Sequence, residues 1–170
     1  MIGRLMNITD AIALLDEQVP NPSMGLPDEL FYYISRTTPL VNVDLLIKDE
    51  TGRTLLAWRN DQYAGKGWHV PGGIIRFREK LETRVEKVAE TELGVSTISF
   101  EPVPVALNQI IALEREIRGH FISLLYRCFV SSTFAPKNEG VAMGDRGYVM
   151  WHDHCPDNLL KFHEIYRNHI

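Results

Sequence analysis

The chain has 170 residues, of which 45% are hydrophobic and 24% charged, which is ordinary for one globular domain that buries a core without disulfides or a structural metal. The formal net charge of -4 argues against a general nucleic-acid-binding surface, which needs a basic face, but it leaves room for a nucleotide pocket. Cys128 and Cys155 lack metal-ligand spacing, no apolar run reaches the length of a membrane span, and residues 1–4 show no secretory leader pattern. We therefore expect a cytoplasmic protein with neither a membrane nor a nucleic-acid partner.

Residues 1–25 are expected to form an arm and a linker, and residues 26–170 the main domain. The arm begins with a short amphipathic helix that Thr9 or Asp10 can cap. Its apolar stripe consists of Ile8, Ile12 and Leu15. A Pro-rich linker follows, so the helix either packs on its own domain or reaches a second subunit. The sequence leaves both arrangements open.

Beyond the linker, a second short helix is expected over 27–35, and strand-like segments then dominate the chain. The expected strands are 40–48, 54–58, a short segment at 68–70 that runs into a glycine turn, 103–111, 120–130 and 148–151. The expected helices are 80–93, ended by Gly94, and 158–168, capped by Asp157. This alternation predicts an α/β domain, a mixed sheet with helices packed on it.

The segment from Gly72 to Val95 joins a glycine turn to an acidic helix. Its buried stripe consists of Leu81, Val85 and Val88, and its solvated ridge of Glu82, Glu86 and Glu90, with Arg84 and Lys87 as ion-pair partners on the same surface. Glu92 falls at the edge of the buried stripe, where a carboxylate is unfavourable unless it is paired or holds a cation. Two glycines before the helix allow a backbone carbonyl to come close to a bound cation. Mg²⁺ binds few protein oxygens, because water and phosphate supply most of its ligands.

The spacing within this segment resembles the Nudix box, G-x5-E-x7-R-E-U-x-E-E-x-G-U, where U is aliphatic. The matching positions are Gly73, Glu79, Glu92, Gly94 and Val95. Lys87 replaces the arginine, and Val88 and Thr91 replace two acidic positions. The missing acids make the chain similar to one branch of the family, the GDP-mannose mannosyl hydrolases, which work with a single Mg²⁺. Similarity to that branch includes the segments 35–44, 55–60 and 67–73 and runs from about residue 26 to residue 151.

The resemblance implies a Nudix-type α/β/α sandwich with a mixed sheet, to which an N-terminal helical arm is added. It implies Mg²⁺-dependent hydrolysis of a GDP-sugar, GDP-mannose or GDP-glucose, to GDP and free sugar by inverting substitution at the anomeric carbon. The Gly72 carbonyl and Glu92 would hold the metal. Arg59 would neutralise the departing GDP, and Asp44 would contact the sugar or orient catalytic groups. The resemblance also implies a homodimer.

Two further positions are expected at the substrate. Arg36 lies in the segment that enters the first strand, and His120 opens a later strand. His120 is equally compatible with a satisfied histidine at a strand end. The remaining histidines near the C-terminus, His152, His154, His163 and His169, show no metal-ligand pattern and receive no role.

The branch carries a Gln-His pair in a late loop, which supplies a metal ligand and the general base. The corresponding residues here, 136–148, contain neither Gln nor His. Asp145 or Glu139 can substitute as ligand or base, and we take Asp145 as the catalytic candidate; His120 is another. Ile74 follows the glycine pair where the branch has arginine, and Arg76 comes two residues later. Two alternative functions stay open: a Nudix pyrophosphohydrolase of another nucleoside diphosphate derivative, and a nucleotide-binding module with a decayed site.

Overall fold

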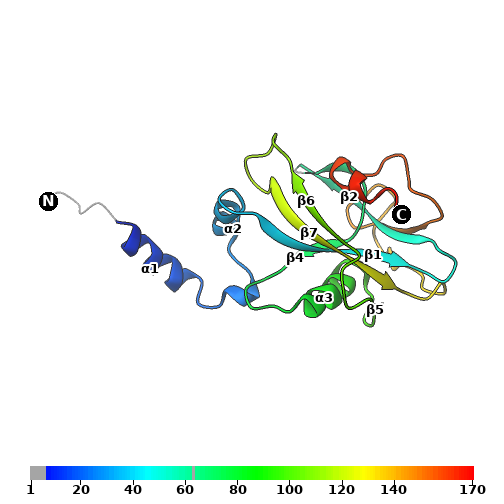
Figure 1. Ribbon diagram of the computed structural model, residues 1–170, viewed down its shortest axis with the longest axis horizontal. Coiled ribbons are helices and arrows are strands. Elements are labelled where there is room, and N and C mark those ends of the chain that lie inside the picture. The colour runs from blue at the N-terminus through cyan, green and yellow to red at the C-terminus, as the bar shows by residue number, and fades with distance from the viewer. Residues whose placement is uncertain (1–6, 63) are drawn as a thin grey trace.

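The computed structural model describes residues 7–62 and 64–170. Its centre is strand β1 (Leu40–Lys48), which pairs in parallel with β7 (His120–Phe129) along its whole length. The first half of β1 also pairs antiparallel with β4 (Gly72–Ile74), and its end pairs antiparallel with β2 (Thr54–Asp61). The sheet is therefore mixed, as the sequence predicted (Figure 1).

Four more strands complete an eight-stranded sheet. β3 (Gly65–His69) and β8 (Val149–His152) both pair antiparallel with β2, whereas β5 (Ser99–Phe100) and β6 (Ala106–Ile111) pair antiparallel with β7. The expected strands are all present: β1 has the predicted bounds, and the ends of the others are shifted. The sequence did not predict β4 and β5, because strands of three and two residues are too short to show an alternating pattern.

Side chains on the two faces of β1 build two separate parts of the core. Val43, Leu45 and Ile47 point to one face and pack with Val85 and Val88 of helix α3 (Leu81–Leu93). The opposite face is covered by the C-terminal segment, and its buried members are Leu46, Leu56, Trp68, Val70, Leu125, Leu159 and Tyr166. Figure 1 shows α3 below the sheet and the C-terminal segment above it, which is the three-layer arrangement expected.

Helix α3 begins one residue later than expected, and Gly94 ends it as predicted, in the left-handed conformation with φ of 68°. The ridge of Glu82, Glu86 and Glu90 is exposed, as predicted. Arg84 does not join that ridge. It is buried, and its guanidinium lies 2.6 Å from the Glu79 carboxylate, so the expectation of a surface ion pair within the helix was wrong for this residue.

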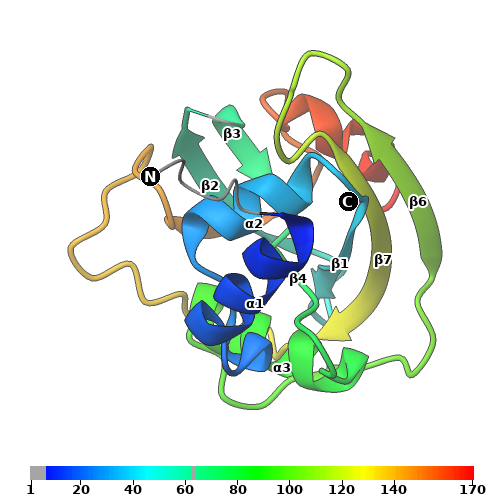
Figure 2. The same cartoon turned by 90° about the vertical axis from the view of Figure 1, so that its left-hand side faces the viewer.

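The N-terminal arm contains helix α1 (Ile8–Gln18), a short η1 turn (Pro22–Met24) and then α2 (Asp28–Ser35). Asn7 caps α1 by accepting a hydrogen bond from the Asp10 amide, which corrects the expected cap at Thr9 or Asp10. No residue of α1 is buried, and Figure 1 shows the helix projecting to the left, away from α2 and the sheet; in Figure 2 it points toward the viewer. Its apolar stripe therefore does not pack into its own domain. The first six residues of the expected arm lie outside the described residues.

The expected C-terminal helix over 158–168 was wrong. Residue 158 lies in a turn, and Leu159 forms a parallel bridge with Trp68 of β3: the Trp68 amide donates to the Asn158 carbonyl (3.0 Å) and the Leu160 amide donates to the Trp68 carbonyl (2.8 Å). Only a 3-10 helix, η2 (Lys161–Tyr166), follows. Pairing with an exposed strand edge satisfies backbone groups that a helix would otherwise satisfy within itself. Within the described residues, no helix is long and apolar enough to cross a membrane.

Candidate active site

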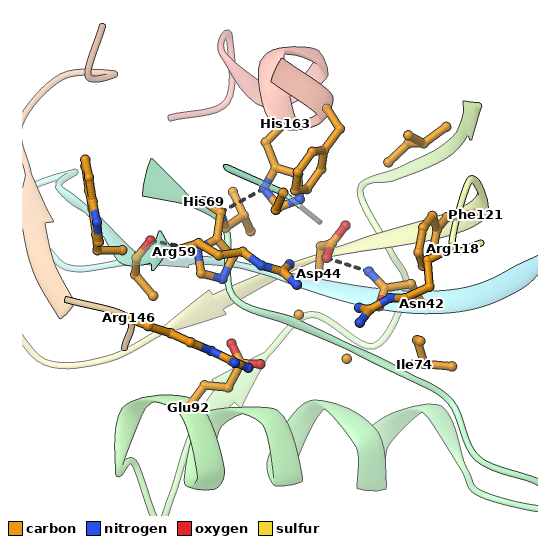
Figure 3. A pocket seen from close by; sticks show the side chains of 18 of the residues that line it. Asn42, Asp44, Arg59, His69, Ile74, Glu92, Arg118, Phe121, Arg146 and His163 are labelled. Atoms are coloured by element: carbon orange, nitrogen blue, oxygen red, sulfur yellow. Dashed lines mark hydrogen bonds between the residues drawn. The ribbon is translucent and has the colours of Figure 1, made fainter. Parts of the chain in front are cut away.

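A cavity of about 560 Å³ lies where β1 to β4, the last turn of α3 and η2 converge (Figure 3). Its charged lining residues are Asp44, Arg59, Glu92, Arg115, Arg118 and Arg146. Four guanidinium groups thus face two carboxyl groups. An excess of arginine in a partly enclosed space favours a substrate with several negative charges, because each guanidinium matches the geometry of a phosphate.

Gly72 and Glu92, the two residues expected at a metal, lie together in this cavity. Register places Gly72 opposite Asp44 on β1, and the last turn of α3 brings the Glu92 side chain to hydrogen-bond with the Gly72 backbone. Glu92 lines the cavity, toward which its carboxyl group points (Figure 3). Removal of its carboxyl group from bulk water raises its pKa to about 7, against the lowering effects of the Gly72 hydrogen bond and of Arg59. A carboxylate in such a place is stabilised by a cation.

Both glycines of the pair allow close approaches that a side chain would prevent. A Cβ on Gly72 would collide with Oδ1 of Asp44 and lie 2.8 Å from the Val43 carbonyl oxygen. A Cβ on Gly73 would lie 2.7 Å from a methyl group of Val88. The glycine pair therefore lets β4 fit between the buried carboxylate of β1 and helix α3.

Asp44 lies on the cavity floor and is only 2% exposed. Its Oδ1 accepts from the Asn42 amide (2.6 Å), and its Oδ2 accepts from the hydroxyls of Ser123 (2.5 Å) and Tyr166 (2.6 Å). Burial raises its pKa, and these three donors oppose that rise. Because both oxygens already have protein partners, the geometry fits an orienting role for Asp44 better than direct contact with a sugar.

Arg59 projects from β2 across the cavity, as Figure 3 shows. Its Nε donates to Asp61 (2.5 Å), which holds the side chain from one side. The sequence did not single out Arg115, Arg118 or Arg146 as site residues. Arg115 and Arg118 come from the connection between β6 and β7, and Arg146 from the loop before β8; no periodic pattern assigns a residue in such a loop to a face.

Two histidines that received no role also line the cavity. Nδ1 of His69 lies 2.7 Å from the Ala57 carbonyl oxygen, and Nδ1 of His163 accepts a hydrogen bond from the Val70 amide (2.9 Å). The rings are tilted to one another with centroids 5.9 Å apart. The sequence contains a signal that could have located His69. Successive side chains of a strand point to opposite faces of the sheet, so if Trp68 points into the core, His69 must point to the opposite face of β3. His163 has no such signal, because its segment was predicted to be helical.

Four other candidate residues lie elsewhere. Arg36 and His120 line a second depression of about 310 Å³, where Arg36 stacks on the Tyr33 ring and His120 Nε2 lies 2.9 Å from the Gln109 side-chain nitrogen. Arg115 lines both depressions, so the two spaces adjoin. The two loop carboxylates, Asp145 and Glu139, are exposed and do not line either depression. Asp145 instead accepts a hydrogen bond from the Ala142 amide within its own loop.

Solved structures with similar folds include Nudix hydrolases. The MutT Nudix hydrolase from Burkholderia pseudomallei matches with a TM-score of 0.60 and 23% identity over 78% of this chain and 98% of that one. A possible asymmetric diadenosine tetraphosphate hydrolase from Jonesia denitrificans matches with a TM-score of 0.53 and 21% identity over 68% and 77% of the two chains. The chain therefore has the Nudix fold, which confirms the fold that the resemblance implied.

No family model matches the chain. The low-salt glycan biosynthesis protein Agl8 from Haloferax volcanii is 40% identical over 78 residues, which are 46% of this chain and 49% of that protein. The chain thus spans about half the length of this curated relative.

Proposed function

We propose that the chain is a Mg²⁺-dependent hydrolase of a GDP-sugar, GDP-mannose or GDP-glucose, which releases GDP and free sugar by substitution at the anomeric carbon. The observation that carries this proposal is the position of the Glu92 carboxyl group beside the backbone of Gly72, in a cavity that four arginines line. One carboxylate and one carbonyl are two of the ligands that the resemblance implies for the single-Mg²⁺ branch, which takes a further ligand from the late loop. The name of the Haloferax relative also supports the proposal, because glycans are built from activated sugars.

The residues at this corner fit Mg²⁺. Within residues 7–62 and 64–170, no three carboxylate, histidine or cysteine side chains come together as a metal site. Mg²⁺ tolerates such a sparse set because it retains waters and binds substrate phosphates, and it prefers the hard oxygens that Gly72 and Glu92 offer. Bound there, the ion would neutralise charge on the diphosphate and so make GDP a better leaving group.

The remaining charged residues have separate tasks in this proposal. Arg59, which Asp61 holds from one side, would add a fixed guanidinium at the diphosphate, and Arg146 would face the same anion across the cavity. Asp44 would hold the residues at the floor of the site in place, because it accepts hydrogen bonds from three of them. The proposal includes the homodimer and the cytoplasmic setting expected from the sequence.

The bond that breaks decides between this function and its nearest alternative. Purified protein is incubated with GDP-mannose and MgCl₂ in ¹⁸O-labelled water, and the nucleotides and sugars are separated. GDP together with labelled mannose is the expected result, with no reaction after chelation of the metal. GMP and a sugar phosphate would instead show attack at phosphorus, as in a pyrophosphohydrolase. Nucleotide binding without turnover on a panel of nucleoside diphosphate derivatives would identify a decayed binding module.

A further inference from the structure

We propose that His69 is the general base that removes a proton from the attacking water. This inference rests on the proposed hydrolase function and deepens it, because it supplies the group that loop 136–148 lacks. His69 lies on β3 and lines the same cavity as Arg59, Asp44, Glu92 and Arg146 (Figure 3).

The hydrogen bond at Nδ1 fixes the state of the ring. A carbonyl oxygen only accepts, so the contact between Nδ1 and the Ala57 carbonyl places the ring hydrogen on Nδ1 and the free lone pair on Nε2. Burial, and next the charge of Arg59, lower the pKa of His69 to about 4, so the ring is neutral near pH 7. A neutral ring with its Nε2 lone pair available is the form that a general base requires.

The other histidines cannot take this role from where they lie. Nδ1 of His163 accepts a hydrogen bond from the Val70 amide, so the neutral ring carries its hydrogen on Nε2. At the cavity this ring can therefore donate a hydrogen bond but cannot accept a proton. His120 lines the second depression and not the main one. His152 packs against the Trp68 ring with centroids 4.4 Å apart, and neither His154 nor His169 lines the cavity.

The carboxylates of the cavity are already engaged. Asp44 accepts three hydrogen bonds, and Glu92 hydrogen-bonds with the Gly72 backbone at the proposed metal corner. The Asp145 carboxylate lies outside the cavity and accepts from the Ala142 amide in its own loop. Among the described residues that line the cavity, His69 is thus the titratable group left to accept a proton.

In the proposed step, one bond forms at the anomeric carbon and one bond to that carbon breaks. The oxygen of a water molecule forms a bond to the anomeric carbon while Nε2 of His69 takes one of its hydrogens as a proton. The bond from that carbon to the diphosphate oxygen breaks, and its electron pair leaves with GDP. The products are free sugar, GDP and an imidazolium on His69, which then returns its proton to solvent.

Substrate charge would strengthen this base. Arg59 and Arg146 both disfavour protonation of His69 in the free protein. A bound diphosphate neutralises these two guanidinium charges, so the imidazolium becomes easier to form when substrate is present. The arrangement couples proton acceptance to occupation of the cavity.

The test compares three variants in GDP-mannose turnover and in binding of GDP with Mg²⁺. His69→Asn keeps an amide that can donate to the Ala57 carbonyl but lacks the acceptor at Nε2. We expect its kcat to fall by roughly 100- to 10,000-fold, with GDP binding within about twofold of wild type. His69→Ala should lose the same activity and regain part of it in added imidazole. His154→Asn, an exposed histidine outside the cavity, serves as the control and should behave as wild type.

The possible results test the assignment of His69 as general base separately from the proposed hydrolase function. Loss in His69→Asn with retained GDP binding and imidazole rescue of His69→Ala supports the proposal. An unchanged kcat in His69→Asn overturns the assignment of His69 and leaves the hydrolase function intact. Weakened GDP binding without imidazole rescue also overturns it and shows a structural role. A wild-type protein that binds GDP but leaves GDP-mannose intact overturns the proposed function, and the base with it.

Discussion

The Tyr166 hydroxyl donates a hydrogen bond to the Asp44 carboxylate (2.6 Å), although 122 positions separate the two residues in the chain. The Ser123 hydroxyl lies 2.5 Å from the same carboxylate and 2.6 Å from the Tyr166 oxygen, which closes a three-membered network. These residues join β1, β7 and η2 at the cavity floor. Because η2 also carries His163, the network fixes one wall of the candidate active site.

Removal of the Tyr166 hydroxyl should lower the free energy of unfolding, because it breaks the contact between η2 and β1. Tyr166→Phe leaves Asp44 with two donors in a buried site, and a lost hydrogen bond to a buried charged group costs about 2 kcal/mol. We expect the urea midpoint to fall with no change in the slope of the transition, as measured by tryptophan fluorescence. Tyr33→Phe, at a side chain that is 52% exposed, is the control and should leave the midpoint in place. Equal midpoints for both variants would show that the hydroxyl does not tie η2 to β1.

Glu79 gives the fold a defined acid sensitivity. Burial would raise its pKa, but hydrogen bonds from the Arg76 amide and from the side chains of Arg84 and Lys87 outweigh burial and lower the pKa to about 2. A carboxyl group whose pKa is lower in the folded state stabilises the fold fully above its unfolded pKa, near 4.5. That stabilisation is lost as the pH falls from about 4.5 toward 2.

Glu79→Gln should remove this part of the pH dependence. The variant loses about 2 kcal/mol at pH 7, the usual effect of removing hydrogen bonds to a charged group, and the difference from wild type shrinks toward pH 2 to 3. Urea titrations at several pH values measure it. Glu82→Gln, on the exposed ridge of the same helix, should follow the wild-type curve. A constant gap between Glu79→Gln and wild type from pH 7 to pH 2 would contradict the assigned ion pairs.

The sequence predicted best where a regular period links a residue to a face. The run of Val, Leu and Ile in 40–48 and the helical stripe of 80–93 located β1 and α3, and the box spacing singled out Gly72 and Glu92, which both line the cavity. The sequence failed where tertiary pairing overrides local preference, as in 158–168, where Leu159 forms a bridge with Trp68 of β3. It also failed for Arg115, Arg118 and Arg146, because irregular loops carry no period.

We expect the Mg²⁺ dependence of turnover to require the Glu92 carboxylate. Glu92→Gln keeps the size and the hydrogen-bonding capacity but removes the negative charge that would hold Mg²⁺. We expect kcat on GDP-mannose to fall about 100-fold or more, because a metal supplies several kcal/mol of charge stabilisation. Circular dichroism should be unchanged. Glu90→Gln, one exposed position of the helix ridge, is the matched control and should keep wild-type turnover and the wild-type Mg²⁺ requirement.

Arg59 should tolerate even a conservative change poorly. Lysine keeps the positive charge but replaces the planar donor fork with a point charge, and it cannot reproduce the Nε contact with Asp61 while also facing the cavity. We expect Arg59→Lys to lower kcat/KM for GDP-mannose by about tenfold or more. Arg127→Lys changes an exposed arginine that pairs with Glu101 outside the cavity, and it should leave kcat/KM unchanged. Similar kinetics for both variants would place the diphosphate away from β2.

The exposed stripe of α1 predicts a role in assembly. Ile8, Ile12 and Leu15 are 80%, 53% and 41% exposed, and no residue of this helix is buried against its own domain. Exposed apolar stripes of this kind mark interaction sites, and in the expected homodimer the stripe would contact the second subunit. Deletion of residues 1–25 should therefore leave the thermal midpoint of the domain nearly unchanged at low protein concentration but shift sedimentation toward monomer. Ile12→Asp in the full chain should have the same effect, whereas Asp16→Asn should not. A truncated chain that sediments as the full-length protein does would exclude the arm from the interface and leave the sheet-containing body as the surface of assembly.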